Sequence, residues 1–99
     1  MYRSDSYDKK LSIKLKNPKF AQSYLLALVE DDDEPMEIED ALRLAIQKMG
    51  TTDFAHLIDE DKANVDKFLK GARVLKEESL NKYLEPFNLQ VEKVLKKVA

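Results

Sequence analysis

The chain has 99 residues, of which 43% are hydrophobic and 36% are charged, and its formal net charge is −2 at pH 7. This length supplies one domain with a modest core, and the absence of cysteine excludes disulfides and thiolate metal sites. No apolar run reaches the roughly 18 residues of a membrane span and no signal peptide precedes the charged segments, so we expect a cytoplasmic protein without a membrane partner.

Few glycines and prolines, together with many Leu, Lys, Glu and Ala, favour an all-α protein. The first patterned segment is Leu11-Ser-Ile-Lys-Leu15, whose strict alternation predicts a strand. A lone strand needs a partner, so this segment is either an extended arm or a strand that pairs across a dimer, and a helical first turn is the alternative. We therefore divide the chain into an N-terminal arm over residues 1–16 and a single helical domain over residues 17–99.

Asn17 followed by Pro18 predicts a helix start, with Asn as the N-cap and Pro at the first helical position. Apolar residues then recur at helical spacing up to Val29. The acidic run Glu30–Glu34, followed by Pro35, ends this helix because adjacent like charges repel and oppose the helix macrodipole. We interpret the run as a solvated linker, since no glycine-containing calcium-loop spacing follows it.

The strongest amphipathic pattern covers Met36 to Met49, and Gly50 is its expected C-cap residue. Thr52 is expected to cap a short helix over about 53–58, and Asp61 a second over about 62–70 that Gly71 ends. The apolar residues of these two helices share a spacing that predicts a helix-turn-helix over about residues 52–70. They are Phe54, Ala55, Ile58, Val65, Phe68 and Leu69.

Residues 76–87 predict a further helix, in which Pro86 kinks or tightens the last turn. Asn88 is a plausible left-handed C-cap. Beyond it, an apolar pattern continues at roughly helical spacing through Leu89, Val91, Val94, Leu95 and Val98. That C-terminal piece packs either on the domain or on a second subunit.

These segments together resemble the HigA-type addiction-module antidote proteins, which are antitoxins and transcriptional regulators. The resemblance extends over about residues 15–91. It is carried by the pattern at 15–25, the acidic stretch, the helix at 39–49, Thr52-x-Phe54-Ala55, Val65-x-x-Phe68-Leu69-x-Gly71 and the pattern at 80–89.

The resemblance implies a lambda-repressor-like bundle of about five helices that represses its own operon and captures a small basic toxin ribonuclease. Our leading hypothesis is a homodimer that inserts the helix at Lys62–Lys70 into the major groove of DNA, and we expect no cofactor or metal. The DNA-facing residues carried over from the pattern are Thr51, Thr52, Lys62, Ala63, Asn64, Asp66, Lys67 and Lys70, and Arg73 is a candidate for backbone contacts.

The chain departs from the family pattern at the turn, where Gly, an aliphatic residue and Ser are replaced by Asp59, Glu60 and Asp61. Asp59 has to adopt the left-handed turn, Glu60 removes a small core contact and Asp61 places a charge toward the phosphates. Val74-Leu75 also replaces the usual proline of the next connector. These changes affect DNA binding more than they affect the fold.

Catalysis is not expected. His56 is the single histidine and has no His or Cys partner, so it is expected on the surface of a helix. No nucleophile elbow or glycine-rich phosphate loop is present. The alternative to DNA binding is a protein-interaction module of the same fold that holds a basic partner through Glu30–Glu34 and Asp59–Asp61.

Overall fold

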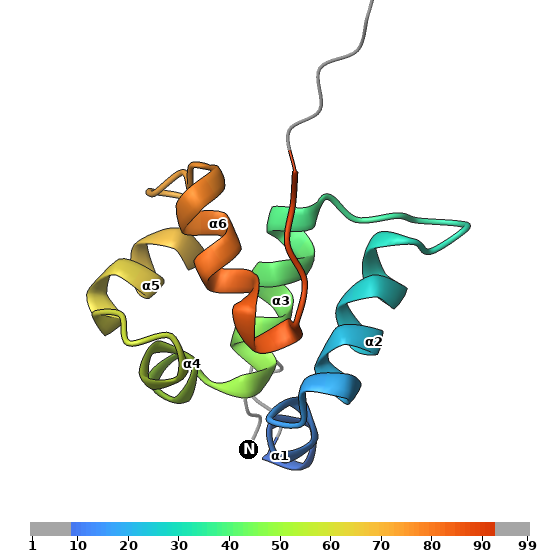
Figure 1. Ribbon diagram of the computed structural model, residues 1–99, viewed down its shortest axis with the longest axis horizontal. Coiled ribbons are helices and arrows are strands. Elements are labelled where there is room, and N and C mark those ends of the chain that lie inside the picture. The colour runs from blue at the N-terminus through green and yellow to red at the C-terminus, as the bar shows by residue number, and fades with distance from the viewer. Residues whose placement is uncertain (1–8, 93–99) are drawn as a thin grey trace, which may run out of the picture.

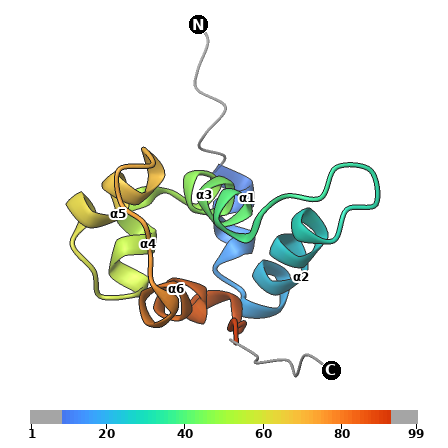
Figure 2. The ribbon, with the colours of Figure 1, turned by 90° about the horizontal axis from the view of Figure 1, so that it is seen from above.

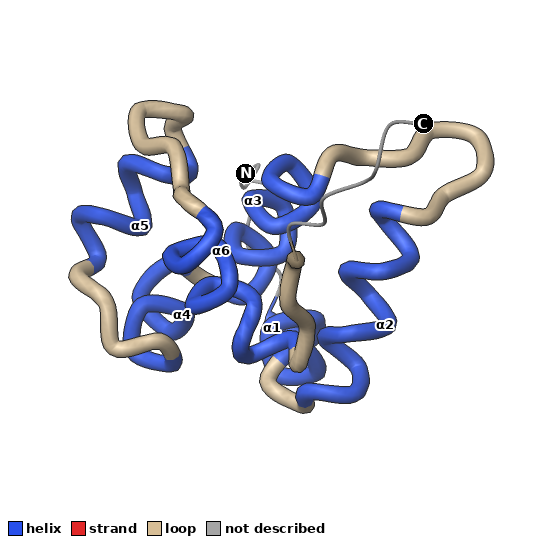
Figure 3. Tube along the Cα trace, turned by 45° about the horizontal axis from the view of Figure 1, so that its top comes forward, coloured by secondary structure: helices blue, strands red, loops and turns tan. Residues whose placement is uncertain are grey.

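The structure, a computed structural model, describes residues 9–92, and all regular secondary structure in that range is helical (Figures 1 and 3). This confirms the predicted all-α class. The elements in chain order are α1 Lys9–Leu15, α2 Pro18–Val29, α3 Ile38–Met49, α4 Thr51–Leu57, α5 Lys62–Leu69, α6 Glu77–Leu84 and the 3₁₀ helix η1 Glu85–Phe87. No helix among these is long and apolar enough to cross a membrane.

The extended arm or strand predicted at the N-terminus is wrong for residues 9–15, which form α1, so the helical alternative holds there. Leu11 and Leu15 are four residues apart, so a helix places both on one face, and both pack on the core. The buried hydroxyl of Ser12 donates a hydrogen bond to the carbonyl oxygen of Met49, 2.6 Å away. The alternation that predicted a strand was too short to exclude this helical face, and α1 belongs to the same core as the helices after it.

The predicted start of α2 is confirmed, since the side-chain oxygen of Asn17 accepts hydrogen bonds from the backbone amides of Lys19 and Phe20. The helix ends at Val29, before the acidic run, as predicted. The following loop is ordered locally by Asp31, whose carboxylate accepts from the two backbone amides at 33 and 34. The loop projects from one end of the molecule between α2 and α3 (Figure 1).

Helix α3 lies at the centre, in contact with α1, α2, α4 and α5 (Figures 1 and 2). It begins at Ile38 rather than at Met36, because Glu37 is in an extended conformation and serves as the N-cap residue. The amide of Met36 donates to the carbonyl of Leu28 near the end of α2. Five of its residues are buried: Ala41, Leu42, Ala45, Ile46 and Met49. Gly50 ends the helix as predicted, with a φ of 106° that favours glycine.

Helix α4 follows α3 without a connector, because Gly50 is the last capping residue of α3 and also the N-cap residue of α4. The prediction that Thr52 caps this helix is therefore wrong, and Thr52 lies inside its first turn. Asp61 stands at the N-cap position of α5 as predicted, but its side chain makes no capping hydrogen bond. Gly71, with a φ of 79°, ends this region.

Helix α6 closes the core over α4 and α5 through aromatic contacts. The ring of Tyr83 lies 5.6 Å from that of Phe54 and 5.3 Å from that of Phe68, measured between centroids. Pro86 lies in η1, which is the tightened last turn that the sequence predicted, and Asn88 adopts a left-handed φ of 55°. The predicted helical continuation is wrong for residues 89–92, and residues 93–98 lie outside the described part of the chain.

Candidate nucleic-acid interface

Helices α4 and α5 are joined by the four-residue turn Ile58–Asp61. Asp59 adopts the left-handed conformation that the sequence required, with a φ of 55°. The next amide, that of Glu60, donates to the carbonyl of Ala55 at 2.9 Å and so reverses the chain. The side chains of Ala55, Ile58 and Val65 are buried on either side of the turn, which fixes the two helices against each other.

The side chain of Glu60 points into the protein and joins three elements. Its Oε1 accepts a hydrogen bond from Lys82 Nζ of α6 at 2.9 Å. Its Oε2 accepts from Asn64 Nδ2 at 2.8 Å and from Arg73 Nη1 at 3.1 Å. The same nitrogen of Arg73 also donates to the hydroxyl of Tyr83 at 3.3 Å. Glu60 therefore binds the turn to α5, to the following connector and to α6.

This environment stabilises the charged form of Glu60, whose side chain is only 13% exposed. The hydrogen bond from Lys82 is the main cause that lowers the pKa of Glu60 to about 2, and the bonds from Asn64 and Arg73 lower it further, against the opposing effect of burial. Burial conversely raises the pKa of the neighbouring Tyr83 hydroxyl. Glu60 is thus a charge compensated by two cations, and it does not belong to an exposed acidic surface.

One face of α5 is turned to solvent. Since each residue advances a helix by about 100°, five of the carried-over residues share an arc of about 140°. They are Lys62, Ala63, Asp66, Lys67 and Lys70, of which only Asp66 is partly buried. Lys62 Nζ pairs with Asp66 Oδ2 at 3.3 Å on this face. Lys67 and Lys70 form no ion pair within the described part of the chain.

The opposite face of α5 is fixed to the protein by Val65 and Phe68, both fully buried. Arg43 of α3 holds the end of the helix in two ways. Its Nε donates to the carbonyl oxygen of Phe68 at 2.8 Å, and its guanidinium carbon lies 4.5 Å from the centre of the Phe68 ring. The exposed lysine face is therefore presented by a helix that has several independent anchors.

The remaining carried-over residues do not join this face. Asn64 lies about 60° beyond Lys67 around the helix, and its amide is bound to Glu60. Arg73 is bound to Glu60 and Tyr83. Thr51 and Thr52 lie in the first turn of α4, with Thr52 exposed and Thr51 partly buried. The set predicted as one site is thus divided between the α5 face, an internal network and the start of α4.

Sequence reasoning did not identify Lys82 or Arg43, which complete the support of this region. A signal existed for the first, because a carboxylate in the turn between two helices requires a cation when it is buried. His56 is exposed, and the described residues contain no group of three or more His, Cys, Asp or Glu placed to hold a metal ion.

Comparison with protein-family models, with curated proteins and with solved structures found no match to this chain.

Proposed function

We propose that the protein is a DNA-binding transcriptional regulator of the antitoxin type, and that the exposed face of α5 enters the major groove. The observation that carries this proposal is the division of α5 into an anchored apolar face and a solvent-facing arc with Lys62, Lys67 and Lys70. A helix that is held from behind and offers cations in front suits insertion into a groove lined by phosphates.

The inward position of Glu60 supports the proposal because it weakens the main electrostatic objection to it. In the sequence, three consecutive acids at the turn oppose the approach of phosphate. In the folded chain, Glu60 is compensated by Arg73 and Lys82, so only Asp59 and Asp61 remain exposed there. The short side chain of Ala63 leaves room for an approach to the base edges, where apolar contact with a thymine methyl is a common readout.

Three lysines give one chain few phosphate contacts, so specific binding requires two copies. A homodimer would place two α5 helices about 34 Å apart, one turn of DNA. In the proposed setting, a cytoplasmic protein represses its own operon and also captures a small basic toxin ribonuclease, as the sequence resemblance implies. The chain's own promoter is the natural first DNA to test.

The test is fluorescence anisotropy with that promoter fragment over a salt series. Lys67→Glu with Lys70→Glu is expected to weaken binding at least about tenfold at low salt and to reduce the salt slope by about two, one unit for each lost phosphate contact. The matched control is Lys10→Glu with Lys19→Glu, which makes the same charge change on exposed positions of α1 and α2. Equal weakening by both pairs, or no binding by the wild type at micromolar concentration and low salt, would sink the proposal.

A second candidate function is the protein-interaction module that holds a basic partner. It is favoured by the loop 30–34, whose five carboxylates are exposed and form no ion pair with described residues. Co-purification with the product of a neighbouring gene, compared between the wild type and Asp32→Lys with Asp33→Lys, separates this function from DNA binding. Retention that does not depend on these two charges contradicts it.

A further inference from the structure

Helix α2 is apolar on almost every side. Apart from the Tyr24 hydroxyl, its polar side chains are Lys19, Gln22 and Ser23. A helix with so little polar surface is normally enclosed by its neighbours. Yet α2 lies at one side of the molecule, where its main contacts are with α1, α3 and η1 (Figures 1 and 2). Only Ala21 and Leu25 are buried, so much of the apolar surface of α2 remains in contact with water.

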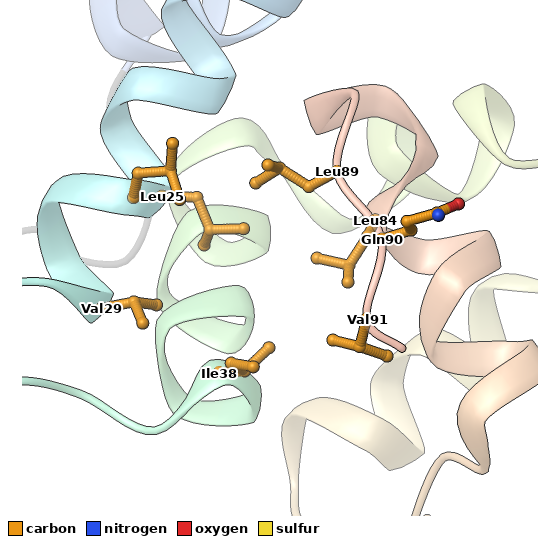
Figure 4. A pocket seen from close by; sticks show the side chains of 8 residues that line it. Leu25, Val29, Ile38, Leu84, Leu89, Gln90 and Val91 are labelled. Carbon is orange, nitrogen blue, oxygen red and sulfur yellow. The ribbon is translucent and has the colours of Figure 1, made fainter. Parts of the chain in front are cut away.

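The inner side of α2 is already used by the chain itself. Leu25 and Val29 line an apolar groove of about 110 Å³ together with Ile38 of α3 and Val91 of the chain after η1 (Figure 4). These side chains belong to the packing of α2 on its own domain. A partner that covers α2 therefore has to use the side turned away from these contacts.

The outer side of α2 carries opposite charges at its two ends. Because each residue advances the helix by about 100°, an arc of about 80° contains the exposed residues Lys19, Ser23, Ala27 and the C-cap residue Glu30. The rings of Phe20 and Tyr24 stack beside this arc, with their centroids 6.3 Å apart. This outer face thus has a cation at its start, small side chains at its middle and a carboxylate at its end.

The charges at the ends of this outer face have no counter-ion among residues 9–92, since neither Lys19 nor Glu30 forms an ion pair there. The two residues cannot pair with each other in one chain, because about 16 Å of helix separates them. The sequence around them extends the same polarity: no acidic residue occurs from Lys9 to Val29, and every residue from Glu30 to Glu34 is acidic. The helix macrodipole has the same sense, so the start of α2 attracts anions and its end attracts cations.

We propose that the outer face of α2 pairs with the same face of a second copy, in an antiparallel arrangement about a two-fold axis. Lys19 and Glu30 are equally distant from the middle of the face, between Tyr24 and Leu25. An antiparallel partner therefore brings each Lys19 opposite the Glu30 of the other copy, whereas a parallel partner would bring like charges together. The small side chains of Ser23 and Ala27 allow the helix axes to approach to about 8 Å. One surface serves both copies, as an isologous contact requires.

This contact goes beyond the proposed DNA binding and does not depend on it. Helices α2 and α5 lie on opposite sides of the molecule, so the pairing leaves the lysine face of α5 free in both copies (Figures 1 and 2). It joins free chains and is distinct from the arrangement that spaces two α5 helices on DNA. Because self-association is measured without DNA, failure of either proposal leaves the other standing.

The first test is sedimentation equilibrium of the full chain up to several hundred micromolar. Lys19→Glu and Glu30→Lys are each expected to raise the dissociation constant of the dimer at least about tenfold, because two attractive pairs become two repulsive ones. The combined substitution restores the attraction and should return the constant to within about threefold of the wild type. The matched control is Lys67→Glu, Glu78→Lys and their combination, which make the same charge changes at exposed positions of α5 and α6 and should have no effect.

The absence of cysteine allows a second measurement by disulfide formation. Ser23 lies close to the proposed two-fold axis, so Ser23→Cys is expected to form an interchain disulfide at least about tenfold faster than Ala63→Cys, which is exposed on α5. Adding Lys19→Glu should slow the reaction at position 23, and adding Glu30→Lys to that variant should restore it. All these substitutions are at exposed positions, and circular dichroism checks that each variant is folded.

The outcomes are distinct. Weaker self-association in both single variants and recovery in the combined variant support the proposal. A chain that stays monomeric at the highest concentration overturns it. Self-association that neither single substitution weakens overturns it as well, because another surface would then join the copies. Failure of the combined variant to recover also overturns it, because Lys19 and Glu30 would then not face each other.

Discussion

At the scale of single residues, the burial of the Glu60 carboxylate is the feature that most needs a physical explanation. Moving a carboxylate out of water costs several kcal/mol unless cations and donors replace the lost hydration. Lys82, Arg73 and Asn64 supply that replacement at distances of 2.9, 3.1 and 2.8 Å. The result is a set of polar contacts that joins the turn to α5, to the following connector and to α6.

Replacement of this charge by Glu60→Gln is expected to lower the free energy of unfolding by about 2 kcal/mol at pH 7, since hydrogen bonds to a charged group are lost. Urea denaturation followed by circular dichroism measures the change. Glu34→Gln, an exposed loop substitution, is the control and should have little effect.

The lowered pKa of Glu60 also predicts that the stability difference between the wild type and Glu60→Gln depends on pH. The folded pKa of Glu60, about 2, is below the ordinary value of 4.5, so its charge contributes full stability above about pH 4.5 and loses it as pH falls toward 2. The difference in stability between wild type and Glu60→Gln should therefore shrink over that window. A difference that stays constant from pH 6 down to the acid limit contradicts the assigned role.

The sequence could identify Glu60 as unusual but could not name its partners. Lys82 is 22 residues away and Arg73 is 13, and no local pattern indicates which of the chain's 17 cations will approach a given carboxylate. For the same reason Asn64 and Arg73 were assigned to DNA. Their residue types suited that role, but their tertiary contacts were not visible in the sequence.

At the scale of elements, the caps and breaks were largely predictable. Asn17 acts through its side-chain oxygen, and Gly50 and Asn88 act through their left-handed backbone conformation, all of which local sequence specifies. The helix α1, which the sequence leaves open only as the alternative to an extended arm, is held by tertiary contacts instead. Its seven residues are too few to be stable as an isolated helix, so a short alternating pattern could not reveal it.

The contact that holds α1 can be tested by Ser12→Ala. Because the buried carbonyl of Met49 loses its 2.6 Å donor, the free energy of unfolding should fall by about 1 to 2 kcal/mol. Ser23→Ala, on the exposed surface of α2, is the matched control and should be neutral. Equal stabilities of the two variants by thermal denaturation would show that this hydrogen bond does not anchor α1.

The two left-handed residues that flank α5 should respond to substitution with opposite signs. Asp59→Gly removes a Cβ from a φ of 55° and should stabilise the protein by about 0.5 to 1 kcal/mol. Gly71→Ala adds one at a φ of 79°, where no atom lies within 4 Å, and should destabilise it by about 1 kcal/mol through backbone strain alone. Chemical denaturation of both variants checks the pair. The same sign for both would contradict this account.

At the scale of the whole molecule, α3 is the central helix, since it contacts α1, α2, α4 and α5 (Figure 2). The fold class followed from the sequence because amphipathic periods and helix breakers are local. The proposed DNA-binding surface depends in addition on two copies, which no feature of a single chain specifies.

A dimer with two α5 helices one turn apart makes a geometric prediction. Insertion of about five base pairs between the half-sites of the promoter should abolish tight binding, because it rotates one half-site to the opposite side of the duplex, and insertion of about ten should partly restore it. Anisotropy titrations with the three fragments measure this. Insensitivity to the spacing would mean that the chain binds as independent monomers.

The shared residue Gly50 has a consequence for how the length of this chain can vary. As the end of α3 and the start of α4, it leaves no connector between the two helices. One residue added at that junction would displace α4 and α5 from α3, against which Phe54 and Ala55 are buried, and would change the direction in which α5 presents its lysines. A residue added to the exposed loop after α2 changes only the length of that loop and leaves the packed helices in place. Viable length changes should therefore accumulate in residues 30–37 and be selected against at position 50.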